Sequence, residues 1–109
     1  MMRKLFDEEL EKLNVDLTKM GHLVELAIEN MIDAFKHQDK TLAKEIITND
    51  RLINDMERTV ESRAFNLILR QQPIATDLRN VTTALKIVTD LERIGDQAAD
   101  IAEIIMNFE

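Results

Sequence analysis

Apolar side chains recur every three or four residues along most of the chain, which is the spacing of amphipathic helices. The first run covers residues 5–37, and its main apolar positions are Phe6, Leu10, Leu13, Leu17, Met20, Val24, Ala27, Met31 and Ala34. Further apolar side chains widen this stripe, as expected for a helix that packs against two neighbours. Gly21 interrupts the run, and we interpret it as a tolerated or closely packed helical glycine, with a hinge as the alternative.

The same spacing predicts two more helices. The second covers residues 40–70, and we expect Asp39 to cap its N-terminus because Asp39 precedes the new apolar period. Pro73 then ends the second helix and begins the third, because proline lacks an N–H and restricts the residue before it. The third helix covers residues 74–107. We therefore predict an all-α, elongated antiparallel three-helix bundle, formed by a single domain over residues 1–109.

The third helix carries more apolar surface than two neighbours can cover. One stripe consists of Leu78, Val81, Leu85, Val88 and Ala99. A second stripe, on the far side, consists of Ile87, Leu91, Ile94, Ala98, Ile101 and Ile105. We expect this helix to face the core nearly all round, with the surplus covered by another bundle. A two-fold homodimer is the simplest such arrangement.

Composition narrows the range of partners. The chain has 109 residues, with 14 Lys and Arg against 21 Asp and Glu, for a net charge of −7. Nucleic acid is therefore an unsuitable partner. The chain has no cysteine, so any metal would need oxygen or imidazole ligands. No window approaches 18 uncharged apolar residues, and the N-terminus turns acidic early, so we expect a cytoplasmic protein.

Acidic residues interrupt the first stripe of the third helix. Four carboxylates share about 80° of its circumference, namely Glu92, Asp96, Asp100 and Glu103. Two carboxylates ~5 Å apart in a semi-buried groove repel by roughly 3 kcal/mol, so we expect a cation there. Oxygen ligands favour hard cations, and the hypothesis is a site for iron, manganese, zinc or magnesium ions. The alternative pairs these acids with nearby basic side chains, namely Arg79, Lys86 and Arg93.

Two acids also intrude on the apolar side of the second helix. Asp50 and Glu57 lie within about 60° of Ile53 at 100° per residue. For the second helix considered alone, the favoured interpretation is that both acids lie at the solvated edge of its apolar side and pair with Arg51, Arg58 or Arg63.

Several segments together resemble the PhoU family. They are Arg70-Gln71-Gln72-Pro73-Ile74-Ala75-Thr76-Asp77-Leu78-Arg79, Leu85-Lys86-Ile87 and Asp90-Leu91-Glu92-Arg93-Ile94-Gly95-Asp96, with a similar opening over residues 3–10. The resemblance implies a phosphate-signalling regulator, typically built from two three-helix repeats that each carry a metal-holding Glu/Asp-x-x-x-Asp motif. Glu92 and Asp96 match that motif. The implied metal ligands are therefore Glu92 and Asp96, with Asp100 as an additional candidate.

The resemblance also implies a place in the cell. A PhoU-like protein acts beside the phosphate ABC transporter and damps phosphate-starvation signalling through contact with the transporter ATPase and a sensor histidine kinase. It meets the membrane only through these partners. Two features depart from the family pattern. The chain holds one repeat, so it is either a first-repeat fragment or a single-repeat variant, and Asp100 stands where the family often has asparagine.

An enzyme of the di-iron carboxylate class is the main rival hypothesis. Such sites need Glu-x-x-His pairs, yet Lys19 and Ala34 precede His22 and His37 by three residues. We expect both histidines at the surface or at helix ends. The sequence shows no phosphate loop or nucleophile motif, so we predict a non-enzyme. A helical oligomerisation module without metal remains the alternative.

Overall fold

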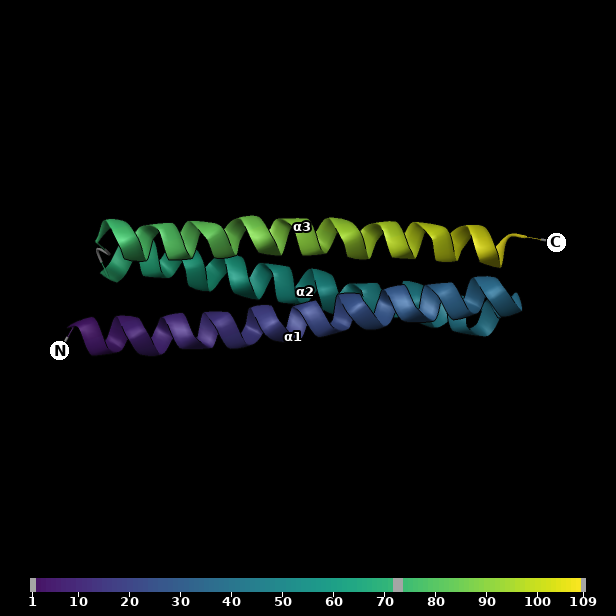
Figure 1. Cartoon of the computed structure of the whole chain (residues 1–109), viewed down its shortest axis with the longest axis horizontal. Coiled ribbons are helices and arrows are strands. Elements are labelled where there is room, and N and C mark those ends of the chain that lie inside the picture. Colours follow the sequence, from purple (N-terminus) through teal and green to yellow (C-terminus); the bar gives the residue numbers. More distant parts are fainter. Residues whose placement is uncertain (1, 72–73, 109) are drawn as a thin grey trace.

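The computed structural model describes residues 2–71 and 74–108, which form three helices: α1 (Met2–His37), α2 (Lys40–Gln71) and α3 (Ala75–Met106). No strand occurs within these ranges. The helices run antiparallel in sequence order, so that the two ends of the chain lie at opposite ends of a rod (Figure 1). The rod measures 60 × 17 × 16 Å. The prediction of an elongated antiparallel three-helix bundle is confirmed.

The first turn of α1 begins earlier than the sequence predicts, because Arg3 has three partners there. Its guanidinium lies 5.4 Å from the centroid of the Phe6 ring and pairs with Asp7 at 3.2 Å. The same group donates to the carboxylate of Asp77, which is buried in the first turn of α3. These contacts extend the helix to Met2 and tie the start of α1 to the start of α3. The predicted role of Pro73 lies outside the described residues.

A two-residue turn joins α1 to α2. Gln38 takes a left-handed φ of 51°, and the N–H of Asp39 donates to the carbonyl of Ala34 at 2.9 Å, which closes α1. The Asp39 carboxylate then accepts the N–H of Leu42 at 3.0 Å. Asp39 is therefore the N-cap of α2, as predicted, and so short a turn makes the two helices antiparallel.

The core contains the predicted stripe of α1, the apolar side of α2 and one seam of α3. Its fully buried side chains include Leu13, Met20, Val60, Leu67, Val81 and Val88. The seam of α3 runs between its two apolar stripes and uses small residues, namely Ala84, Gly95, Ala98, Ala99 and Ala102. The expectation that α3 faces the core nearly all round is wrong, since Leu78, Ile87 and Ile94 are 39–41% exposed. The small residues let α3 approach its neighbours closely along this seam. Leu78, Ile87 and Ile94 lie at the edges of the seam and are therefore partly exposed.

Three other positions follow from the same packing. Helix α1 continues through Gly21, and an added Cβ there would meet nothing within 4 Å, so this is a tolerated helical glycine that close packing within the bundle does not require. His22 and His37 are exposed, as predicted. Across the described ranges, none of the helices combines the length and hydropathy that crossing a bilayer requires.

The Asp39 cap provides a test of the turn. Asp39→Ala should lower the free energy of unfolding by about 1 kcal/mol, because the N–H of Leu42 loses its acceptor. Asp39→Asn retains an acceptor and should cost only a few tenths of a kcal/mol. Urea denaturation followed by circular dichroism gives both values. Equal stability of the Ala variant and the parent would show that this hydrogen bond does not support the turn.

Candidate functional site

The acidic residues of α3 that the sequence suggests as metal ligands differ in how far they are buried. Glu92 and Asp96 are half-buried at the edge of α3, whereas Asp100 and Glu103 are exposed. Each step of four residues turns the side chain by about 40°, so the line from Glu92 through Asp96 to Asp100 rotates away from the seam. The expectation of a semi-buried acidic groove is wrong for Asp100, which this rotation exposes, and for Glu103, which is exposed in the last turn of α3.

Helix α2 supplies the other half of this acidic cluster. Asp50 and Glu57 are both half-buried, and the negative charge of Asp96 on α3 acts on the carboxyl group of Asp50. Oδ1 of Asp50 is buried, and none of the described residues donates a hydrogen bond to it. We call Asp50, Glu57, Glu92 and Asp96 the carboxylate cluster.

The expected pairing of the α2 acids with arginine does not form among the described residues. Arg63 instead contacts α1, where its Nε lies 2.8 Å from Asp16 and its Nη1 lies 3.7 Å from Glu9. Arg58 pairs with Asp55 at 3.8 Å. The ion pairs found over residues 2–71 and 74–108 include neither Asp50 nor Glu57. Among the described residues, the two α2 acids of the cluster therefore have no ion-pair partner.

Gly95 brings the two acidic edges together. A Cβ at this position would lie 3.2 Å from two carbons of Ile53 and 3.5 Å from Oδ1 of Asp50. A contact of 3.2 Å is tighter than most Cβ contacts, so any larger residue here would have to displace the Ile53 side chain by a few tenths of an ångström. Sequence reasoning assigned Gly95 no role, although a glycine inside a helix next to two acids is a signal of close backbone approach.

The close approach raises the pKa values of three cluster members. A side-chain hydrogen bond to Asp96, burial and the nearby negative charges raise the pKa of Glu92 to about 7. Burial and the charges of Asp96 and Asp100 raise the pKa of Asp50 to about 6. The pKa of Glu57 is also raised, chiefly by burial. A bound cation would reverse each of these effects, because it stabilises the ionised carboxylates.

The geometry fits a metal ion only in part. Carboxylate oxygens, one of them buried and without a donor, are chemically suited to a hard cation. Within the described residues, however, no three side chains of His, Cys, Asp or Glu converge in a metal-binding arrangement. Glu92, Asp96 and Asp50 supply carboxylate oxygens at the α2–α3 edge, but in the described conformation these three side chains do not form a metal-binding arrangement. Asp100 lies further out and acts on Asp50 through its charge.

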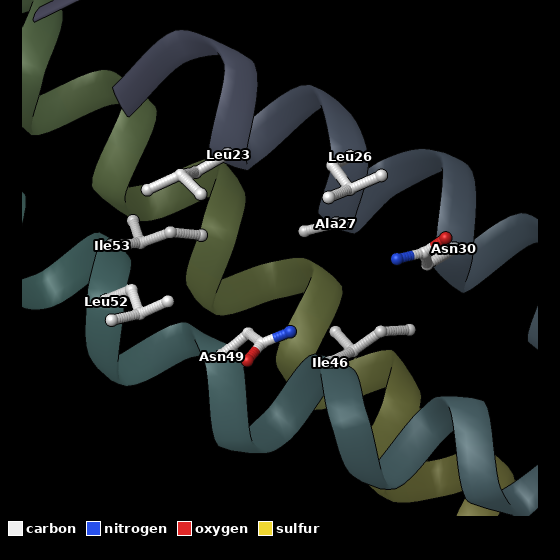
Figure 2. Close-up of a pocket in the computed structure, with 8 residues that line it drawn as sticks. All are labelled: Leu23, Leu26, Ala27, Asn30, Ile46, Asn49, Leu52 and Ile53. Carbon is white, nitrogen blue, oxygen red and sulfur yellow. The ribbon is translucent and has the colours of Figure 1, made fainter. Parts of the chain in front are cut away.

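The apolar cleft between α1 and α2 is a different feature. Figure 2 shows it between the two helices, with Asn30 and Asn49 among leucine and isoleucine side chains. Its residues are Leu23, Leu26, Ala27, Asn30, Ile46, Asn49, Leu52 and Ile53. The enclosed space is about 40 Å³, far below the roughly 300 Å³ of a typical small-molecule site. This cleft is therefore not a substrate pocket in the described conformation.

The raised pKa values predict that the metal-free protein loses stability as the pH rises from about 5 to about 8. Glu92 has an ordinary pKa near 4.5 and a folded-state pKa of about 7, so its contribution to stability is full below pH 4.5 and is lost as the pH rises through 7. The melting temperature in chelator should therefore fall between pH 5 and pH 8. Glu92→Gln should flatten this slope, whereas Glu29→Gln, on the exposed surface of α1, should leave it unchanged. An unaltered slope in Glu92→Gln would contradict the raised pKa.

Comparison with known proteins places the motif in context. The family model described as the PhoU domain matches residues 17–105. A Clostridium acetobutylicum protein is 47% identical over 106 residues, which cover 96% of this chain and 48% of the relative. Relatives from Thermotoga maritima and Rhizobium meliloti are 38% and 35% identical and are covered over 42% and 43% of their length. All three are named phosphate-specific transport system accessory protein PhoU homologues.

The chain spans less than half the length of these relatives, whereas they align over 90% or more of the chain. The family match extends over the second half of α1, all of α2 and nearly all of α3, so it includes every member of the carboxylate cluster. The chain belongs to the PhoU domain family.

Proposed function

We propose that this chain is a regulator of phosphate uptake and phosphate-starvation signalling that works by protein–protein contact. The observation that carries the proposal is the position of the Glu92-x-x-x-Asp96 motif, half-buried at the α2–α3 edge in a chain that matches the PhoU domain. Its relatives are named as accessory proteins of the phosphate-specific transport system. The proposed partners are the phosphate transporter ATPase and a sensor histidine kinase, and the proposed activity is repression of the starvation response without catalysis.

The proposed location is the cytoplasm, at the membrane only through these partners. A helical rod with a net charge of −7 offers long side faces for docking and little attraction for anionic lipid. We also propose that the chain self-associates as a homodimer, since α3 leaves Ile87, Ile94 and Ile101 partly exposed.

We further propose that the carboxylate cluster holds a divalent or ferric ion such as iron, zinc, manganese or magnesium. Glu92 and Asp96 would supply oxygen ligands, with Asp50 on α2 and the outer Asp100 as additional ones. Such an ion, when bound, would supply positive charge that neutralises the cluster. The residues themselves provide a half-buried set of oxygens on two helices, so occupancy would link the separation of α2 and α3 to metal availability.

The metal proposal predicts opposite effects of one double substitution. Glu92→Gln with Asp96→Asn should lower metal occupancy, because an amide is a weaker ligand than a carboxylate. The same change should stabilise the metal-free bundle by about 1 kcal/mol, after allowance for solvent screening, because like charges are removed. Elemental analysis and thermal unfolding in chelator measure the two effects. Asp90→Asn, which is exposed on the same helix, is the control. Unchanged metal content in the double variant would contradict ligation by these residues.

The regulatory proposal predicts a genetic phenotype. Deleting the gene in its host should leave phosphate-responsive genes expressed when phosphate is plentiful. Reintroducing the parent sequence should restore repression. Transcript levels at high phosphate, measured in strains that lack any second homologue, give the answer. Normal repression in the deletion strain would contradict the regulator assignment.

A further inference from the structure

The groove between α1 and α2 is hollowed near the end of the rod at which α1 begins. A first hollow of about 250 Å³ is lined by Leu5, Glu9, Asn66, Leu67 and Arg70. A second hollow of about 390 Å³ is lined by Glu8, Glu11, Lys12, Val15, Asp16 and Arg63. Glu9 of the first hollow pairs with Arg63 of the second at 3.7 Å, so the two hollows are neighbours. We call them together the N-terminal groove, which is separate from the apolar cleft of Figure 2.

Ion pairs within the N-terminal groove neutralise some of its charges. Glu9 has a base at each oxygen, since Oε1 lies 3.2 Å from Lys12 and Oε2 lies 3.7 Å from Arg63. Oδ2 of Asp16 lies 2.8 Å from Nε of Arg63. These two acids and two bases therefore compensate one another inside the groove.

Three other charged side chains of the groove lie outside these pairs. Over residues 2–71 and 74–108, the ion pairs include neither Arg70 in the first hollow nor Glu8 and Glu11 in the second. All three are exposed. Arg70 lies in the last turn of α2, where a positive charge also favours the helix end, but that effect does not require the hollow beside it. The groove thus offers a positive charge at one hollow and negative charge at the other.

An apolar side chain also lines each hollow without being covered. Leu5 in the first hollow and Val15 in the second are each 47% exposed. They stand ten residues apart on α1, which is about 15 Å at the rise of an α-helix. The bundle buries neither side chain fully, so both are available for contact with another molecule.

We propose that an amphipathic helix of a partner protein lies in the N-terminal groove. This inference rests on the regulation by protein–protein contact proposed above and specifies its face. Apolar side chains of the partner helix, two to three turns apart, contact Leu5 and Val15. An acidic side chain of the partner pairs with Arg70, and a basic one pairs with Glu8 and Glu11. Because the two hollows differ in charge, they fix the direction in which the partner helix lies.

Shape and charge favour a helix over a smaller or flatter occupant. The groove follows α1 over residues 5–16, a length of about 16 Å or three helical turns. A small molecule would fill one hollow and leave the charges of the other unpaired. An anionic membrane would attract Arg70, but Glu8 and Glu11 beside it would repel the same surface.

The first experiment tests the groove in the host. Arg70→Glu should lose repression of phosphate-responsive genes at high phosphate, because it places an acid against the partner's acid. Arg70→Lys keeps the positive charge and should retain repression. Arg79→Glu, at an exposed arginine of α3 outside the groove, is the matched control and should also retain it. The purified Arg70→Glu protein should melt within about 3 °C of the parent, which separates docking from folding.

The deletion strain distinguishes failure of this inference from failure of the proposed function. Normal repression after deletion of the gene would overturn the regulatory proposal and the docking that rests on it. Loss of repression in the deletion strain, with normal repression by Arg70→Glu, would overturn the docking in the groove alone.

The second experiment fills the first hollow. Asn66→Trp should lose repression, because the larger side chain occupies the space of the partner's apolar residue. Asn66 is exposed, so the change should leave the core intact. Asn80→Trp, at an exposed asparagine of α3 outside the groove, is the control and should retain repression. Normal repression by Asn66→Trp would contradict docking in this hollow.

The third experiment identifies the occupant. Selection for restored repression in the Arg70→Glu strain should yield acid-to-base changes in another protein, and these changes should not restore repression to the deletion strain. Suppressors confined to this protein's own gene would overturn a partner helix. In light scattering and in cosedimentation with phosphatidylglycerol vesicles, Arg70→Glu should behave as the parent does. Loss of a parent dimer would assign the groove to a second copy, and loss of vesicle binding would assign it to the membrane, and either result would overturn the proposal.

Discussion

The absence of a side chain at Gly95 is the constraint on which the candidate site depends. It lets Ile53 and Asp50 of α2 pack directly against the backbone of α3. The apolar contact draws the helices together, and the same contact forces Asp50 toward Asp96 in a half-buried place where negative charges repel. The bundle thus uses apolar packing to hold an electrostatically unfavourable arrangement. That arrangement has no evident structural benefit, which is why a functional interpretation is preferred to a structural one.

The end of the bundle at which α1 and α3 begin shows how the fold accommodates a buried acid whose role is structural. Asp77 is 4% exposed and receives the guanidinium of Arg3, which also lies over the ring of Phe6. Its charge is compensated by a basic partner and by the first turn of α3. Asp50, by contrast, has a buried oxygen to which none of the described residues donates a hydrogen bond. The contrast between these two aspartates supports a cation as the missing partner of the carboxylate cluster.

Most of the fold can be predicted from the sequence. The three-to-four-residue spacing of apolar side chains, the Asp39 cap and the polar residues around position 38 predict three antiparallel helices, because each of these signals involves neighbouring residues only. The position of Glu92 beside Asp96 is also a local feature, because side chains four residues apart lie on the same side of a helix. The contact between Asp50 and Asp96 is not local. It depends on the rotation and offset of α2 against α3, which the small residues Gly95 and Ala99 set through close packing. The exposure of Asp100 was missed because the acidic line turns away from the seam by about 40° per step.

The central claim is that the carboxylate cluster is a cation site in which protons are held until a metal displaces them. The most direct measurement is calorimetric titration of the metal-free protein with Mn²⁺ at pH 6.5, in buffers of different ionisation enthalpy. Since the pKa of Glu92 is raised to about 7 and that of Asp50 to about 6, binding should release protons at pH 6.5 and fewer at pH 8. Binding without proton release, or no binding at either pH, would contradict the account.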